Sequence, residues 1–257
     1  MPPSRTRRLM IRAVRGTLRR IGLWPLSLPE DDTALLDMEK PFLALAEKCQ
    51  PFTMTSRERM YSLYKAVNYV VENRIPGDIV ECGLWRGGSS MLAALVLMEK
   101  GDTSRRFHLY DVFAEMPQPT GRDVDLRGVS AETVMATYHE DTGLEACELD
   151  KTRANLLSTG YPADKLVFVK GKVEDTIPGT IPESISILRL DTDWYESTLH
   201  ELRHLFPRLS PGGVLIVDDY GHWRGAREAT DQYFSEMHIP MLLSRIDYTG
   251  RAGVKLS

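Results

Sequence analysis

Two adjacent aspartates, Asp218 and Asp219, follow an apolar run, residues 214–217, that is typical of a buried strand. A single aspartate there would suffice to end a turn or to cap a helix. A third aspartate, Asp191, follows a second run of this kind within the stretch LRLDTDWYES. Because the carboxyl ends of parallel strands meet at one edge of a sheet, we expect the three carboxylates to lie close together.

Three crowded carboxylates repel one another and raise one another's pKa unless a cation lies among them. No run of lysine or arginine stands beside these acids, although Arg189 and Arg224 are near in sequence. Mg²⁺ prefers carboxylate oxygens and leaves positions for the hydroxyls of a substrate. A hydroxyl on such an ion is more acidic, so a neighbouring carboxylate can remove its proton. The three acids therefore predict a magnesium site, and helix caps with solvated acids are the alternative.

A glycine-rich turn, VECGLWRGGSS, follows another expected strand. Gly83, Gly87 and Gly88 let the backbone approach a ligand closely and point the N–H groups of the next helix at it. The spacing is not G-x-G-x-x-G and lacks the lysine of a P-loop, which disfavours a dinucleotide or triphosphate site. The pattern E-x-G-x-x-x-G-G resembles the first motif of class I S-adenosylmethionine methyltransferases, and a purely structural turn is the alternative.

Asp111 ends the next expected strand, 28 residues after Gly83. A carboxylate at that strand end can accept hydrogen bonds from both hydroxyls of a ribose, and it can also cap a helix. Lys172, after the following strand, is placed to contact an adenine through its backbone or its side chain. Together with the glycine turn, these residues predict an adenosine site at the same edge of the sheet.

The elements that must position these residues alternate along the chain. Apolar runs predict strands at residues 79–83, 106–113, 166–171, 184–191, 213–219, 241–247 and 253–257. Helices are expected at residues 33–49, 55–75, 89–101, 142–159, 195–206 and 225–237. This alternation predicts an α/β fold, a mostly parallel seven-stranded sheet with helices on both faces. Thr55 or Ser56 would be the N-cap of the second helix. Residues 117–135, with prolines, glycines and scattered charge, predict a mobile loop or lid.

The chain has 257 residues and a formal net charge of −4, but the charge is unevenly distributed. Residues 1–20 contain seven arginines and no acid, so the remaining chain has a net charge of −11. That balance argues against nucleic-acid binding by the body of the protein. Cys49, Cys82 and Cys147 have no metal-ligand spacing, which favours a reduced, cytoplasmic protein. No apolar run approaches the length of a transmembrane helix.

The basic N-terminal segment has two interpretations. Its apolar and basic residues alternate at roughly helical spacing, so it could lie on an anionic membrane surface near a lipid-linked substrate. A solvated or oligomer-contacting helix in front of the domain is the alternative. We expect residues 1–32 to form this segment and a linker, and residues 33–257 to form the catalytic domain.

With these residues in hand, the chain resembles the macrocin O-methyltransferase family, whose members methylate deoxysugar hydroxyls on macrolides such as mycinamicin and on novobiocin-type antibiotics. The matching segments run from FTMTSRERMYSLYKAV to LSPGGVLIVDDYGHWRGAREA, about residues 50–235, in the order of the family. The block with LSPGGVLIVDDY and RGAREA is the most specific part. The basic N-terminal segment and the sequence of residues 117–140 depart from the pattern of the family, so the identity of the acceptor is not carried over.

The resemblance implies a Rossmann-like class I methyltransferase that uses S-adenosylmethionine as donor and Mg²⁺ held by Asp191, Asp218 and Asp219. It also implies that Asp191 is the general base, and that Thr53 and Met54 face the methyl donor. The residues expected at the cofactor are Thr53, Met54, Glu81, Gly83, Gly87, Ser89, Asp111, Phe113 and Lys172.

The expected reaction methylates a sugar hydroxyl of a glycosylated natural product, polysaccharide or glycolipid. A catechol-type O-methyltransferase and a non-catalytic nucleotide-binding scaffold are the two alternatives. His222 and Trp223 flank the acids and could contact the sugar or simply pack the loop. We further expect a homo-oligomer with a small-molecule or glycan acceptor, no nucleic-acid partner, and peripheral membrane contact through the basic N-terminus.

Overall fold

The computed structural model describes residues 37–142 and 148–256. Within it, Lys40–Ser257 form one compact unit. The basic segment and linker expected at residues 1–32 lie outside the described residues, so their membrane contact stays a prediction. None of the described helices is long and apolar enough to cross a membrane.

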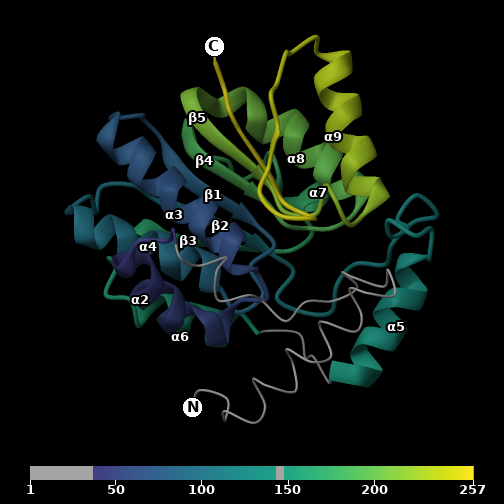
Figure 1. The fold of residues 1–257 in the computed structure, drawn as a ribbon, viewed down its shortest axis with the longest axis horizontal. Coiled ribbons are helices and arrows are strands. Elements are labelled where there is room, and N and C mark those ends of the chain that lie inside the picture. The colour runs from purple at the N-terminus through teal and green to yellow at the C-terminus, as the bar shows by residue number, and fades with distance from the viewer. Residues whose placement is uncertain (1–36, 143–147, 257) are drawn as a thin grey trace, which may run out of the picture. The chain divides into compact units, whose positions relative to one another are not determined.

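A seven-stranded sheet, in the order β3-β2-β1-β4-β5-β7-β6, lies at the centre of this unit (Figure 1). The strands are β1 (Asp78–Cys82), β2 (Phe107–Asp111), β3 (Leu166–Lys170), β4 (Ile185–Leu190), β5 (Leu209–Val217), β6 (Ser244–Arg245) and β7 (Arg251–Val254). Neighbours from β3 to β5 are parallel, whereas β7 runs antiparallel to both β5 and β6. The predicted α/β class with a mostly parallel sheet of seven strands is confirmed.

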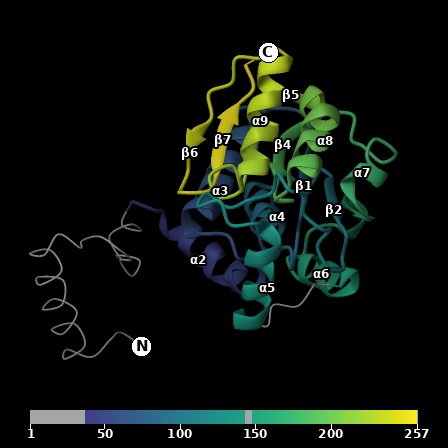
Figure 2. The ribbon, with the colours of Figure 1, turned by 90° about the vertical axis from the view of Figure 1, so that its right-hand side faces the viewer.

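Two groups of helices cover the faces of the sheet (Figures 1 and 2). In one group α3 and α6 each contact α4, and in the other α7 and α9 each contact α8. The first group comprises α2 (Lys40–Cys49), α3 (Arg57–Glu72), α4 (Gly88–Lys100) and α6 (Leu149–Leu157). The second comprises α7 (Val173–Thr176), α8 (Tyr195–Leu205) and α9 (Arg224–Glu236). Because helices cover both faces, the central strands read as continuous apolar runs, and every residue of β4 is buried.

The register of the sheet brings three strand ends into one row. Cys82 of β1 lies beside Leu190 of β4, which lies beside Val217 of β5. The ladder continues one residue further, where the Asp191 N–H donates to the Cys82 carbonyl (2.8 Å) and the Asp218 N–H donates to the Leu190 carbonyl (2.9 Å). The strand order also reverses between β1 and β4, the position at which ligands bind in open sheets of this class.

Several predicted elements need correction. The second helix begins at Arg57 rather than at residue 55, whereas the prediction of Ser56 as its N-cap is confirmed, because the Ser56 hydroxyl accepts the Arg59 N–H at 3.2 Å. Of the helix predicted over 142–159, α6 (Leu149–Leu157) is observed, and residues 143–147 lie outside the described residues. The four-residue α7 is not predicted from the sequence. The loop predicted over 117–135 is wrong at its end, because α5 (Ala131–Thr142) begins there.

The remaining loop residues, 117–130, are held by a buried carboxylate. Asp123 is fully buried and accepts hydrogen bonds from the Thr120 N–H (2.7 Å) and hydroxyl (2.9 Å) and from the Tyr195 N–H (2.8 Å). Trp194, the N-cap of α8, provides no side-chain cap, so Asp123 takes that role from another part of the chain. The segment is therefore fixed to the start of α8.

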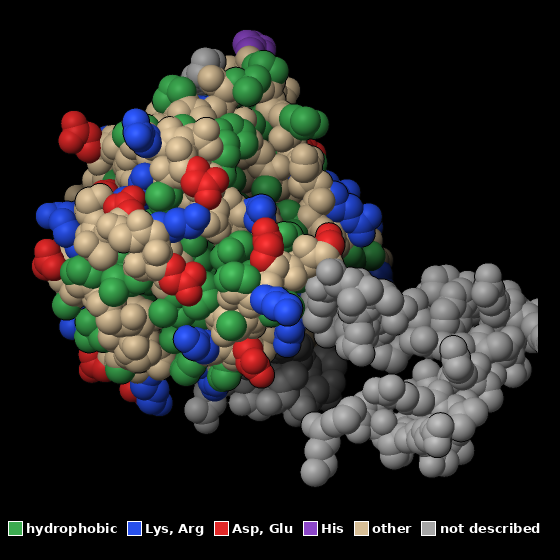
Figure 3. All heavy atoms as spheres, turned by 60° about the vertical axis from the view of Figure 1, so that its left-hand side comes forward, with side chains coloured by type: hydrophobic (Ala, Val, Ile, Leu, Met, Phe, Trp, Pro, Cys, Tyr) green, Lys and Arg blue, Asp and Glu red, His purple; other side chains and the backbone are tan. Residues whose placement is uncertain are grey.

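The surface mixes charges of both signs. Figure 3 shows Lys and Arg side chains interspersed with Asp and Glu on one face of the described residues. A continuous basic surface of the kind that binds nucleic acid does not occur on that face. The absence of a nucleic-acid partner stays a prediction for the chain as a whole.

Replacing the buried carboxylate of Asp123 should destabilise the protein. Asp123→Ala leaves the buried N–H of Tyr195 without an acceptor and removes the bonds to Thr120, so we expect the free energy of unfolding to fall by about 1–3 kcal/mol. Urea denaturation followed by circular dichroism measures the change. Glu115→Ala, at an exposed position of the preceding loop, is the control and should shift stability by no more than about 0.5 kcal/mol. Equal unfolding midpoints for the two variants would contradict the assigned role.

Candidate active site

The three predicted acids converge at the carboxyl ends of β4 and β5. One carboxylate oxygen from each of Asp191, Asp218 and Asp219 lies within 4.8 Å of the other two. Asp218 is buried, with 2% of its side chain exposed, whereas Asp191 keeps 26% exposed. The cluster therefore has one carboxylate that a molecule outside the fold can reach and one that is committed to the interior.

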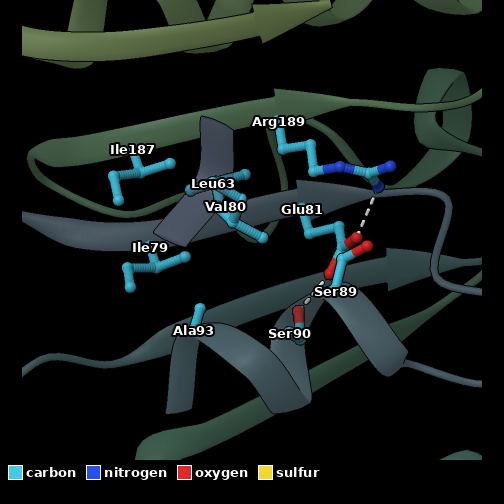
Figure 4. Close-up of a pocket in the computed structure, with 9 residues that line it drawn as sticks. All are labelled: Leu63, Ile79, Val80, Glu81, Ser89, Ser90, Ala93, Ile187 and Arg189. Atoms are coloured by element: carbon cyan, nitrogen blue, oxygen red, sulfur yellow. Dashed lines mark hydrogen bonds and ion pairs between the residues drawn. The ribbon is translucent and has the colours of Figure 1, made fainter. Parts of the chain in front are cut away.

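Two arginines lie among these acids, so the expectation that the acids lack a protein cation is wrong. Arg189 donates from Nη1 to Glu81 (2.6 Å) and to Asp191 (2.7 Å), and from Nη2 to Asp218 (2.7 Å). Figure 4 shows Arg189 and Glu81 reaching toward each other from neighbouring strands. Arg59 of α3 pairs with the second oxygen of Asp218. Both oxygens of Asp218 are thus bound by guanidinium groups.

The sequence itself indicates that Arg189 binds a carboxylate. Arg189 stands inside the run SISILRL, and a charged side chain in a fully buried strand requires a partner of opposite charge. Arg59 had no such signal, because its neighbours in α3, Arg57 and Glu58, are also charged and the helix is only partly buried.

The other side of the cluster carries excess negative charge. Asp193 and Asp219 form no ion pair with either arginine, and the buried Oδ2 of Asp219 has no hydrogen-bond partner. Burial and the charge of Asp191 raise the pKa of Asp193 to about 7. Burial and the charge of Asp193 raise the pKa of Asp219 well above its usual value. A cation placed against Asp219 would compensate both groups.

Asp191 behaves differently from its neighbours. Burial alone would raise its pKa, but the positive charges of Arg189 and Arg59 outweigh burial and hold the pKa below its usual value. Asp191 is therefore ionised at neutral pH, and its partial exposure leaves it able to accept a proton.

The glycine turn lies directly against the acids. Gly83 has φ +83°, and a Cβ there would overlap the carbonyl oxygen of Asp191, so only glycine fits between β1 and β4. Gly87 has the same positive φ and is the N-cap of α4. Asp111 accepts the Leu84 N–H (2.6 Å) and Trp85 N–H (3.1 Å) on one oxygen. The carboxylate predicted to hold a ribose thus also holds the turn in shape.

Asp111 keeps acceptor capacity for a ligand. Its other oxygen accepts the Phe113 N–H at 2.7 Å, which leaves one of its roughly four acceptor sites free. Phe113 has φ +46° and a buried ring, so it can present only backbone to a ligand. The assignment of these two residues to the cofactor stays a prediction.

The other expected cofactor residues are spread around the turn. Glu81 is buried and bound by Arg189 and Ser90, and Ser89 lies 3.5 Å from Thr55 between their hydroxyl oxygens. Thr53 accepts the Thr55 N–H at 3.0 Å, Met54 is 52% exposed, and Lys172 is exposed at the start of α7. The cavity between Glu81, Arg189 and their neighbours has a volume of about 10 Å³ (Figure 4). It holds at most one water, so a cofactor cannot occupy it.

The two flanking aromatic residues differ in role. Trp223 is buried, donates from Nε1 to Asp193 at 3.1 Å and packs edge-on against Trp194 at 5.1 Å between ring centroids. These contacts support the loop-packing interpretation of Trp223. His222 is half-buried, and its ring lies 3.4 Å from the hydroxyl of Tyr248.

The chain is similar to known proteins over most of its length. The family model described as Macrocin-O-methyltransferase (TylF) matches residues 37–253, which is nearly all of the described chain. The chain belongs to the macrocin O-methyltransferase family. It is therefore an O-methyltransferase by family, and the predicted resemblance is confirmed.

Relatives within the macrocin O-methyltransferase family are similar over most of their length. A tetracenomycin rhamnosyl 4'-O-methyltransferase from Streptomyces olivaceus is 38% identical over 86% of this chain and 80% of its own. The mycinamicin III 3''-O-methyltransferase of Micromonospora griseorubida is 32% identical over 77% of this chain and 76% of its own. The solved structure of the O-methyltransferase NovP is 30% identical, has a TM-score of 0.70 and covers 80% of this chain and 83% of that chain.

A side chain at the glycine turn should separate β1 from β4. Gly83→Ala introduces strain from the positive φ, about 1–2 kcal/mol, and overpacking against Asp191 of about 1–3 kcal/mol more. Gly101→Ala is the matched control, since Gly101 has φ +71° and nothing within 4 Å of a Cβ. Thermal unfolding of both variants should show the larger loss for Gly83→Ala. Identical losses would mean that the close approach to Asp191 carries no energy.

Proposed function

We propose that the protein transfers a methyl group from S-adenosylmethionine to a sugar hydroxyl of a glycosylated natural product, a polysaccharide or a glycolipid. The observation that carries this proposal is the convergence of Asp191, Asp218 and Asp219 within 4.8 Å of one another. The register places that cluster beside the glycine turn after β1. A donor held at the turn and an acceptor held at the acids would therefore be neighbours.

A divalent cation, Mg²⁺ by preference, fits this donor set. Asp219 Oδ2 is buried without a partner, and hard cations take carboxylate oxygens of this kind. We infer that Asp191, Asp218 and Asp219 hold the cation, with Arg189 and Arg59 keeping Asp218 in place. The bound cation would orient a sugar hydroxyl and lower its pKa.

Asp191 is the general base of the proposed reaction. It is ionised, 26% exposed and next to the position of the acceptor hydroxyl. As the acceptor oxygen bonds to the methyl carbon, the sulfur–carbon bond breaks and the hydroxyl proton passes to the Asp191 carboxylate. Alkoxide and sulfonium charges disappear together, so the chief contribution of the protein is to keep the partners close and in line.

The turn that follows β1 is the proposed donor site. Gly83 and Gly87 let the backbone approach a ligand closely, and the first N–H groups of α4 face the same edge. Asp111 retains an acceptor site for a ribose hydroxyl. The shared edge of the sheet keeps this site near Asp191.

The acceptor is proposed to be a sugar rather than a catechol. Two relatives that share 32–38% of their residues with this chain are named for methylation of a rhamnosyl-bearing tetracenomycin and of mycinamicin III. Membership of an O-methyltransferase family argues against the non-catalytic scaffold. A homo-oligomer and membrane contact through residues 1–20 remain part of the proposal.

Loss of the base should stop turnover without preventing donor binding. Asp191→Asn keeps the shape of the side chain, so we expect affinity for S-adenosylmethionine to stay within about threefold while kcat falls by about a hundredfold or more. Calorimetry and detection of S-adenosylhomocysteine by mass spectrometry provide the two measurements. Asp150→Asn, exposed on α6, is the control. Full turnover by Asp191→Asn would contradict the role of Asp191 as general base. Methylation of a catechol but of no sugar would contradict the sugar acceptor.

Removal of one ligand should weaken binding of the cation itself. After exhaustive dialysis against EDTA, titration of the whole chain with Mg²⁺ should release heat, and Asp219→Asn should weaken binding by at least about tenfold. Calorimetry reads this effect without reference to activity. Undiminished methyl transfer after chelation, together with no heat from the wild type, would contradict the cation site.

A further inference from the structure

A second pocket begins immediately after the acids. It has a volume of about 300 Å³ and lies between the residues that follow β5, the first turn of α9 and the loop that contains Leu126. Its lining residues are Leu126, Tyr220, Gly221, His222, Trp223, Arg224 and Arg227. The lining contains no acidic residue, although the chain as a whole has more acidic than basic residues.

The two arginines of this pocket are exposed, and the hydrogen bonds that they donate to described residues go to carbonyl groups. The guanidinium of Arg227 also lies 5.2 Å from the centroid of the Tyr220 ring. Arg224 donates to the Leu126 carbonyl at 3.1 Å, and Arg227 donates to the Tyr220 carbonyl at 3.1 Å. Neither forms an ion pair with a described carboxylate, in contrast to the exposed pairs Arg122–Glu228 and Arg203–Glu236. Each guanidinium therefore retains donors for a ligand.

The positive charges stand where the fold already has a positive potential. Arg224 and Arg227 belong to the first turn of α9, which has no acidic residue. The amino end of a helix carries partial positive charge, and side chains three residues apart are neighbours on its surface. The two guanidinium groups therefore add to an unfavourable field that an anion in the pocket would relieve.

The pocket is joined to the proposed methyl-transfer site by one short turn. The Asp219 carbonyl accepts the N–H groups of His222 and Trp223, both at 3.0 Å. The indole N–H of Trp223 is bonded in turn to Asp193 at 3.1 Å. These bonds fix one wall of the pocket against the acid cluster, so a molecule whose sugar lies at Asp219 can extend into the pocket.

We propose that this pocket binds a phosphoryl group carried by the acceptor sugar, so that the acceptor is a sugar phosphate or diphosphate. The proposal rests on the proposed function, since it places the sugar at the acid cluster. A carboxylate needs only one guanidinium fork, whereas the non-bridging oxygens of a phosphate or a diphosphate can engage both Arg224 and Arg227. The diphosphate can belong to a nucleotide sugar or to a lipid-linked sugar, and both present this chemistry.

The first test measures binding of inorganic pyrophosphate to the full chain in EDTA by calorimetry. We expect the wild type to bind, and Arg224→Gln and Arg227→Gln each to weaken binding by about tenfold or more. Arg203→Gln removes the same charge from an exposed ion pair on α8 and should leave binding unchanged. No binding by the wild type, or equal binding by all four proteins, overturns the proposal.

The second test measures methyl transfer to one sugar in four forms: the free sugar, its 1-phosphate, its nucleoside diphosphate and its polyprenyl diphosphate. We expect kcat/KM to favour at least one phosphorylated form by about tenfold or more, and this preference to vanish when both arginines are replaced. The nucleoside and polyprenyl forms distinguish the two sources of the diphosphate. Equal kcat/KM for the free and phosphorylated sugars, or a preference that persists when both arginines are replaced, overturns the proposal.

Failure of the two ideas can be told apart. Arginine-dependent pyrophosphate binding with no methylated acceptor would remove the proposed function and leave the anion pocket. Efficient methylation of the free sugar without pyrophosphate binding would remove the pocket and leave the methyltransferase.

Discussion

The buried guanidinium of Arg189 is the interaction on which the site depends. It lies in a fully buried strand and binds carboxylates from β1, from the end of β4 and from the end of β5. Removing one partner of such a group leaves uncompensated buried charge, which costs about 3–5 kcal/mol. The arrangement therefore ties the geometry of the acid cluster to the stability of the sheet. Asp193 and Asp219 form no ion pair with Arg189, and their raised pKa values favour the neutral form until a cation compensates the negative charge.

The sheet register turns this local pairing into a site. Since Cys82, Leu190 and Val217 lie in one row, the chain emerges from three neighbouring strands at the same height. Gly83 permits the close approach of β1 and β4 at that height because it has no Cβ. The glycine turn and the acids are therefore neighbours without any long loop to bring them together. The arginine-lined pocket follows next along the chain, between the residues after Asp219 and the start of α9.

Sequence patterns predict the strands, most helices and the three acids because each of these follows from short-range periodicity and from the rule that parallel strands end at one edge. They do not predict Arg59 as a partner of Asp218, since that contact joins residues 159 positions apart. They do not predict that Asp123 caps α8 either, because that contact joins residues 72 positions apart. The short α7 has too few residues to show a helical period. The role of Arg189 could have been inferred from its place in an apolar run.

The anchoring of the loop by Asp123 has a consequence for how such an enzyme can diversify. The middle of the segment is fixed at two points, by Asp123 to α8 and by a bridge from Asp125 to Trp223. At the tip of the loop, directly after these two points, Leu126 is 46% exposed and the side chain of Arg127 is 80% exposed. Substitutions at this tip would change the lining of the arginine-lined pocket and leave the anchors beneath it in place. New substrate ranges could then arise through a few neutral surface changes, while the residues beneath them stay under strict selection.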